Sequence, residues 1–289
     1  MNLTEGFGLD TITLAGPLEA RLEAIAGAGF DQVMLNARDL THHTGGVDAA
    51  VRAVKASGLR PTGFQVLRDF EGLSGHLHAY KVDVAKAMLT MCAQLDCRVL
   101  LCCSSASPHA SEDPADLARD LRKLAMLAVP LGIRIAYEGL SWGRTINEYT
   151  TAWDIVCRAD CANLGLALDS FHMLAAKTPL ELIDEIDPGR IFLVQLSDFL
   201  WQETPTFADR MNTARTYRVF PGEGVHTEQV AEIAQRLQRI GYAGDYSFEV
   251  FNDDYQQLPA EVVAERGRRS AVWLREDVLR RPVPLPVRA

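Results

Sequence analysis

Four polar residues stand at the ends of apolar segments that are typical of buried strands. Glu138 lies in AYEGL, Asp169 in ALDSFH, Gln195 in VQLSD and Glu249 in SFEVF. One polar residue at a strand end is ordinarily a cap or bonds to a nearby loop. Four that converge would repel one another unless they pair, protonate or bind a cation. Oxygen ligands prefer a hard divalent ion, so the set predicts a site for Mg²⁺, Mn²⁺ or Co²⁺.

A histidine follows one of these carboxylates at a spacing of three residues. His172 comes after Asp169 in the segment LALDSFHML. The ordinary imidazole pKa of about 6.5 suits proton exchange near neutrality, so His172 is our candidate for the catalytic acid or base. The alternative is a histidine bonded to a loop carbonyl.

Two arginines and their neighbours are the candidates for holding a substrate. Arg68 in VLRDFEG and Arg218 in TYRVFPGEG lie beyond strand segments, where a guanidinium could grip a carboxylate through two parallel hydrogen bonds. Phe70 and Phe220 accompany them and could wall a flat six-carbon ring. Ser197, two residues after Gln195, completes the substrate-binding candidates. Arginines on loops are otherwise surface charges, and the sequence does not decide which of the two would hold the carboxylate.

These residues need a scaffold, and the chain offers eight short apolar segments with strand character. They cover residues 8–14, 32–36, 61–67, 98–104, 134–140, 164–170, 191–197 and 246–251. Segments with helical spacing cover residues 18–29, 47–58, 82–95, 113–132, 146–159, 228–241 and 260–276. This alternation predicts an α/β fold, a single-domain (β/α)8 TIM barrel over residues 1–280, rather than an open sheet. Three prolines predict an irregular tail over residues 281–289.

The composition excludes several classes of function. The net charge of −9 argues against a nucleic-acid partner, and no apolar run approaches the length of a membrane span. The first residues lack the pattern of a secretory signal, so we expect a cytoplasmic protein. The six cysteines include no CxxC pair, and we expect reduced thiols. Neither a nucleotide-binding glycine motif nor a Ser-His-Asp arrangement is evident, so we expect neither a nucleotide cofactor nor acyl-enzyme chemistry.

Several motifs together resemble a known family. YEGLSWG, LDSFH, LVQLSD and SFEVFND are similar to the sugar phosphate isomerase/epimerase superfamily of xylose isomerase-like TIM barrels, and more narrowly to its bacterial 3-dehydroshikimate dehydratases. FQVLRDFEG, LLCCSSASP and YRVFPGEG also resemble the dehydratase branch, so the match extends over nearly the whole chain. The resemblance implies that Glu138, Asp169, Gln195 and Glu249 are the metal ligands. Gln195 stands where the epimerase branches usually have histidine.

The resemblance also implies a reaction. It implies a metal-dependent lyase that dehydrates 3-dehydroshikimate, a cyclic hydroxy-keto acid, to protocatechuate through a metal-stabilised enolate, as in quinate and shikimate catabolism. Long members of this branch carry a second, dioxygenase-like half, so we expect any activity of this chain to come from the barrel.

Two other functions stay open at this point. One is a divalent-metal-dependent ketose epimerase, isomerase or inosose dehydratase, and the other is a non-catalytic sugar-acid-binding barrel. The sequence does not settle the native metal, the oligomeric state, with a homo-oligomer among the alternatives, or the role of the loop with His42 and His43.

Overall fold

Eight parallel strands close into a barrel in the computed structural model, which describes residues 4–280. Around the barrel, β1 to β7 follow in chain order, and β10 closes the ring between β7 and β1. The strands are β1 (Phe7–Asp10), β2 (Gln32–Asn36), β3 (Arg60–Arg68), β4 (Val99–Cys103), β5 (Arg134–Glu138), β6 (Leu164–Asp169), β7 (Ile191–Leu196) and β10 (Tyr246–Phe248). All eight overlap the predicted strand segments, although β1 and β10 end at Asp10 and Phe248 rather than at residues 14 and 251, and the barrel fold is confirmed. The predicted tail, residues 281–289, lies outside the described residues.

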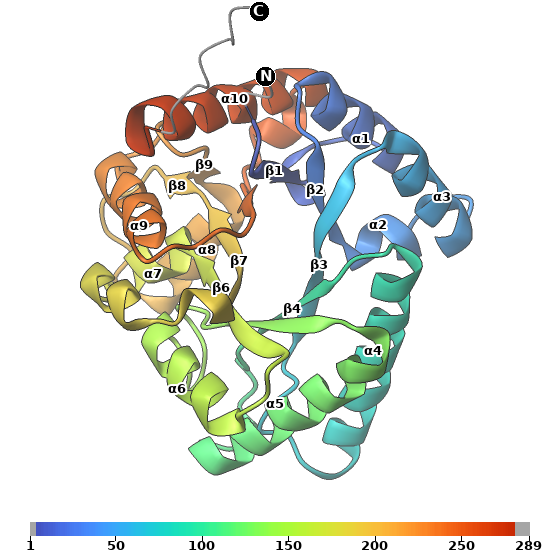
Figure 1. The fold of residues 1–289 in the computed structure, drawn as a ribbon, viewed down its shortest axis with the longest axis vertical. Helices are drawn as coiled ribbons and strands as arrows, with labels where there is room; N and C mark the ends of the chain where they lie inside the picture. The colour runs from blue at the N-terminus through green and yellow to red at the C-terminus, as the bar shows by residue number, and fades with distance from the viewer. Residues whose placement is uncertain (1–3, 281–289) are drawn as a thin grey trace, which may run out of the picture.

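Helices surround the barrel as an outer ring (Figure 1). The longer ones are α1 (Leu18–Gly27), α3 (Val47–Ser57), α4 (Gly75–Gln94), α5 (Pro114–Ala128), α6 (Tyr149–Ala159), α9 (Thr227–Arg239) and α10 (Ala260–Trp273). Short 3₁₀ segments are Thr11–Thr13, Val129–Leu131, Leu180–Glu185, Pro188–Arg190 and Tyr255–Gln257, and a π-helical turn covers Leu274–Val278. None of the helices in the described part of the chain is long and apolar enough to cross a membrane.

Local sequence signals explain where several helices begin and end. The Asp113 side chain accepts a hydrogen bond from the Ala115 amide and caps α5, with Pro114 at the first helical position. α3 ends at Gly58, whose φ of 73° lies in the left-handed region that glycine adopts without strain. α4 begins at Gly75, seven residues before the predicted start at Val82.

The barrel has an inner and an outer apolar layer because successive strand residues face opposite sides. The inner layer consists of Met34, Val99, Leu101, Cys103, Ala136, Leu140, Ala167, Phe192 and Leu193. The outer layer packs the other face of the strands against the helices. Side chains therefore fill the barrel interior, and an open site can form only at one end of it.

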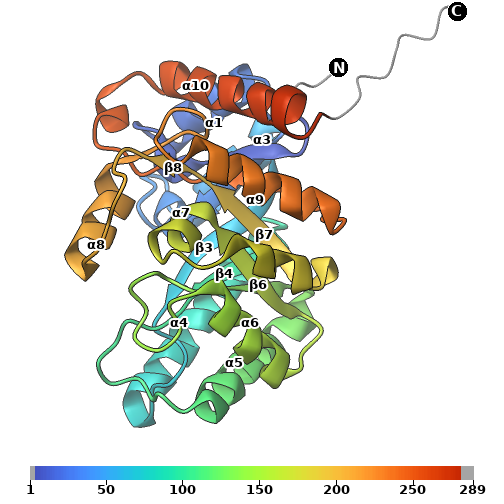
Figure 2. The same ribbon diagram turned by 90° about the vertical axis from the view of Figure 1, so that its left-hand side faces the viewer.

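Elements that the sequence analysis did not predict gather beyond the ends of the strands. α2 (Ala37–Thr41) follows β2, and α7 (Ser170–Ala175) follows β6. Between β7 and α9 the chain forms an antiparallel pair, β8 (Asp198–Phe199) with β9 (Arg218–Val219), and the helix α8 (Phe207–Thr216). Figure 2 shows that α8 projects from one end of the barrel. This insertion carries Arg218 back toward the strand ends.

Candidate active site

A cavity of about 220 Å³ opens at the carboxyl end of the strands. Its wall contains Glu138 from β5, His172 from α7, Arg218 from β9 and Glu249, which follows β10. In a TIM barrel this end of the strands carries the catalytic groups. The structure thus brings five of the ten residues selected from the sequence, these four and Arg68, to the wall of one cavity; Asp169 and Gln195 are not among its lining residues.

Two of the predicted ligands hold buried polar atoms without a hydrogen-bond partner among the described residues. Gln195 is fully buried, and neither its amide oxygen nor its amide nitrogen has a partner. Glu138 is 4% exposed; its Oε2 accepts a hydrogen bond from the Cys103 thiol at 2.8 Å, whereas Oε1 has no partner. Buried polar groups are nearly always paired, so these atoms are the ones expected to face a ligand.

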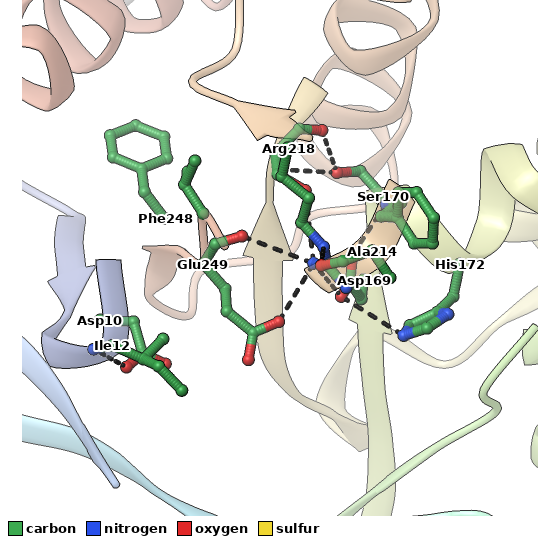
Figure 3. Close-up of polar contacts among 12 residues, drawn as sticks. Asp10, Ile12, Asp169, Ser170, His172, Ala214, Arg218, Phe248 and Glu249 are labelled. Carbon is green, nitrogen blue, oxygen red and sulfur yellow. Dashed lines mark hydrogen bonds and ion pairs between the residues drawn. The ribbon is translucent and has the colours of Figure 1, made fainter. Parts of the chain in front are cut away.

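Arg218 lies between the other two predicted ligands (Figure 3). Its guanidinium Nη1 donates to Asp169 Oδ2 at 2.7 Å and to Glu249 Oε2 at 3.1 Å. The side chain is 2% exposed and its guanidinium carbon lies 4.6 Å from the centre of the Phe171 ring. Arg218 is therefore a buried counter-charge for two carboxylates.

The carboxylates differ in how strongly they favour ionisation. Desolvation raises the pKa of Glu138 to about 8, with further increase from the charges of Asp169 and Glu249. Desolvation also raises the pKa of Glu249 to about 7, although Arg218 acts against this shift. Burial opposes the ionisation of Asp169 too, but the attraction of Arg218 and His172 lowers its pKa below the ordinary range. Asp169 is the fixed negative charge of the site.

The hydrogen bonds of His172 define its tautomer. Its Nδ1 accepts a hydrogen bond from the Ser141 backbone amide at 3.1 Å, so the proton of the neutral ring is on Nε2. Nε2 lies 3.8 Å from Asp169 Oδ2, and the Trp142 ring packs edge-on at 4.7 Å. Burial lowers the pKa of His172 to about 3. The sequence analysis assumed an ordinary imidazole near 6.5; in this environment the ring is neutral at pH 7.

The substrate-binding candidates are divided between the cavity and the core. Arg68 is exposed and lines the cavity. Phe70 and Phe220 do not line it: both are fully buried in the outer apolar layer, where Phe220 stacks on Tyr255. Ser197 is buried below the cavity wall, and its backbone bonds to the Ser170 hydroxyl. Among the five substrate-binding candidates, Arg68 and Arg218 line the cavity.

Sequence reasoning missed several residues of the site. Asp10 ends β1, is fully buried and accepts a short hydrogen bond from the Gln65 side chain. Burial and the nearby Glu249 raise the pKa of Asp10 well above its ordinary value. The rule that strand ends carry polar groups would have found it, had it been applied to the first strand. Trp142 and Arg215 also line the cavity, but their segments carry no such signal.

Comparison with known proteins adds the family. Residues 22–276 match the family model described as the xylose isomerase-like TIM barrel. The chain belongs to this family.

Two relatives of known function are similar in sequence to this chain. The chain is 39% identical, over 92% of its length, to a 3-dehydroshikimate dehydratase of Pseudomonas aeruginosa, and the match covers 41% of the length of that relative. An inosose isomerase of Bacillus subtilis is 31% identical over 53% of this chain and 52% of its own length.

Two solved structures share the fold of this barrel. A xylose isomerase-like TIM barrel/4-hydroxyphenylpyruvate dioxygenase fusion protein has a TM-score of 0.88 at 34% identity, covering 94% of this chain and 43% of its own. The IolI protein, crystallised with a zinc atom, has a TM-score of 0.81 at 22% identity, covering 94% of this chain and 99% of its own. The second likeness concerns the fold alone.

The donor set of this xylose isomerase-like barrel fits a divalent cation. With Glu138, Asp169 and Glu249 ionised, Arg218 leaves two negative charges uncompensated. Single ligand atoms of Glu138, Asp169 and His172 lie within 4.8 Å of one another. A histidine that binds a metal usually donates its other ring N–H, whereas Nδ1 of His172 accepts one. This hydrogen bond argues against His172 as a ligand.

Proposed function

We propose that the protein is a metal-dependent hydro-lyase that converts 3-dehydroshikimate to protocatechuate. The observation that carries this proposal is the set of unpartnered oxygens of Glu138 and Gln195 at the strand ends, beside a cavity that also holds a histidine and an uncommitted arginine. The identity to a curated dehydratase over most of the chain supports this choice of reaction.

In this proposal Glu138, Asp169, Gln195 and Glu249 would hold the cation, with Mg²⁺, Mn²⁺ or Co²⁺ as the expected ions. Such an ion supplies Lewis acidity to the ketone and stabilises the negative charge that follows loss of a proton from the neighbouring carbon. Arg218 lowers the pKa of Asp169 and opposes the rise in the pKa of Glu249, and so favours the ionised forms that bind a cation.

His172 is the proposed proton donor. Its neutral ring lines the cavity with Nε2 3.8 Å from Asp169 Oδ2, and the Ser141 amide holds the ring in this tautomer. From there Nε2 can donate to the hydroxyl that departs, whose basicity rises as its bond to carbon breaks. Nε2 would then take up the proton lost beside the ketone, so that the hydroxyl and one proton leave together as water. A neutral imidazole that acts as a donor has a lowered pKa, as His172 does.

Arg68 is the proposed partner of the substrate carboxylate. It lines the cavity, and no hydrogen bond or ion pair engages its side chain within residues 4–280. Arg218, in contrast, is already engaged by two carboxylates. A guanidinium binds a carboxylate through two parallel hydrogen bonds, so Arg68→Lys should weaken substrate binding by about 1 to 3 kcal/mol while leaving metal content unchanged.

The test is direct. Protein loaded with Mn²⁺ is mixed with 3-dehydroshikimate, and ultraviolet absorbance is followed for an aromatic product. Activity should disappear on chelation and return with added metal. Full activity after the metal is stripped would contradict the four-ligand site.

The second candidate function is a metal-dependent isomerase of a polyol or ketose, which the inosose isomerase relatives favour. It would use the same cation and cavity but would release no aromatic product. An unchanged absorbance with 3-dehydroshikimate, together with turnover of an inosose or ketose, would support this alternative.

A further inference from the structure

We propose that the Cys103 thiol is a positioning residue of the metal centre: it holds one oxygen of Glu138, so that the other oxygen faces the cation. This inference rests on the proposed metal site. It gives a role to a buried cysteine that the reaction itself does not require.

The barrel register explains why the two side chains meet. Cys103 ends β4, Glu138 ends β5, and these residues are paired across the two strands. Paired residues on neighbouring strands point to the same face of a sheet. Cys103 accordingly belongs to the inner layer and lines the cavity, whereas the preceding Cys102 belongs to the outer layer behind the strands.

The contact divides the two oxygens of Glu138 between different tasks. With Glu138 ionised, as binding of a cation requires, the carboxylate can only accept, so the thiol is the donor and bonds to Oε2 at 2.8 Å. Oε1 is buried and has no partner in the described residues. One oxygen is thereby fixed by the protein, and the other is left to bind the cation.

This arrangement favours binding through one oxygen of Glu138. A terminal carboxylate has a broad torsional preference, so without the thiol the group could rotate away from the orientation that directs one oxygen at the cation. Partners that orient a ligand typically change metal affinity by 10- to 100-fold when they are removed. Because S–H is a weak donor, we expect an effect near the lower end of this range.

The test compares three variants of the whole chain by calorimetric titration with Mn²⁺ alone, without substrate. Cys103→Ala removes the donor and should weaken Mn²⁺ binding about 10-fold. Cys103→Ser retains a donor and should restore most of the affinity. Cys102→Ala is the matched control, since it removes the adjacent thiol on the other face of β4, and should bind Mn²⁺ as the unsubstituted protein does. Circular dichroism verifies that each variant is folded.

A second measurement separates a positioning residue from a ligand. The near-ultraviolet spectrum of the Co²⁺-loaded protein should lack an intense sulfur-to-cobalt charge-transfer band. A band that disappears in Cys103→Ser would mean that the sulfur binds the metal, and would overturn the inference.

Two titration results would also overturn it. One is a Cys103→Ala variant that binds Mn²⁺ as tightly as the unsubstituted protein, and the other is a Cys103→Ser variant that binds as weakly as Cys103→Ala. If the unsubstituted protein binds no Mn²⁺, the proposed metal centre fails as well. That outcome differs from failure of the inference alone, in which the metal binds regardless of Cys103.

Discussion

Two buried polar residues only three positions apart, Gln195 and Asp198, have opposite surroundings. The Asp198 carboxylate accepts hydrogen bonds from the backbone amides of Phe199, Gly224 and His226 and from the Thr227 hydroxyl. At Gly224 a β-carbon would overlap this carboxylate. Gln195 has no hydrogen-bond partner in the described structure for either amide atom.

The difference supports the proposed assignment of Gln195 and Glu138 to the metal site. The donors around Asp198 are supplied by the chain, so its role is to connect β8 to the start of α9. The side-chain oxygen of Gln195 and one carboxylate oxygen of Glu138 have no hydrogen-bond donor in the described structure. Burial of a polar atom without a partner costs free energy unless a ligand binds there. Satisfaction of hydrogen bonds, rather than burial or charge, distinguishes the structural group from the functional one.

The largest expected effect comes from removing a proposed ligand. Asp169→Ala should lose the metal and all measurable activity, because the most strongly ionised carboxylate of the site is gone. Metal content by elemental analysis is the measurement. Retention of stoichiometric metal in the folded variant would show that Asp169 is not a ligand.

The next effect should be confined to turnover. His172→Ala should keep the metal and lose turnover by roughly 10²- to 10⁴-fold, since it removes the proposed proton donor. In the unsubstituted enzyme no rate change near pH 6.5 should depend on His172, whose pKa is lowered to about 3. Rates across pH and elemental analysis test both points. If this variant loses its metal as Asp169→Ala does, the histidine is a ligand instead.

Asp198, whose hydrogen bonds are satisfied within the chain, should affect stability rather than metal binding when it is replaced. Asp198→Ala leaves three backbone amides and a hydroxyl without their acceptor, so unfolding free energy should fall by about 3 kcal/mol. Mn²⁺ affinity of the folded variant should not change. Urea unfolding and calorimetry measure the two quantities, and Asp198→Asn, which keeps one acceptor oxygen, should lose less stability. A collapse of metal affinity would remove the distinction drawn above.

Glu71 is intermediate between Asp198 and Gln195, because only one of its two carboxyl oxygens has hydrogen-bond partners in the described structure. Its substitution should have the smallest effect of those considered. One carboxyl oxygen accepts from the Ser105 amide and the Tyr137 hydroxyl, while the other has no partner within residues 4–280. Desolvation raises its pKa to about 7. A carboxyl with a raised pKa in the folded state stabilises the fold most below its unfolded pKa, near 4.5, and this stability is lost as pH rises through 7.

Glu71→Gln should therefore flatten the pH dependence of stability. Between pH 5 and pH 8 the unsubstituted protein should lose roughly 2 kcal/mol more than the variant. Urea unfolding of both proteins at a series of pH values is the measurement. Parallel curves would mean that Glu71 is ionised at the same pH in the folded and unfolded states.

The barrel could be predicted because its strands are continuous apolar segments. Burial on both faces requires apolar residues throughout, and this leaves a clear signal in segments such as Val99–Cys103. The antiparallel pair of β8 and β9 could not be predicted, because two-residue strands have no periodicity and depend on partners distant in sequence. α8 is similar: its sequence, FADRMNTART, has no regular apolar face.

The candidate site was predictable in position more than in detail. Strand-end positions identified Glu138 and Gln195 as polar groups at the barrel rim, but only the structure reveals their unpartnered atoms. Phe70 and Phe220 were placed at the cavity on sequence proximity to the arginines. Proximity does not determine the direction of a side chain, and both rings pack into the outer layer. The ion pairs of Arg218 with Asp169 and Glu249 depend on β9, an element that the sequence did not predict.

The buried Arg218 also has a consequence for the order of events as the protein matures. Many small metal sites leave repelling ligands unbalanced until the ion arrives, so that such proteins fold only when metal is present. Here the chain supplies its own cation between Asp169 and Glu249. With the proposed metal site, the chain should therefore fold before it acquires a metal, and loading would be a separate, later step that depends on which ions the cell has available.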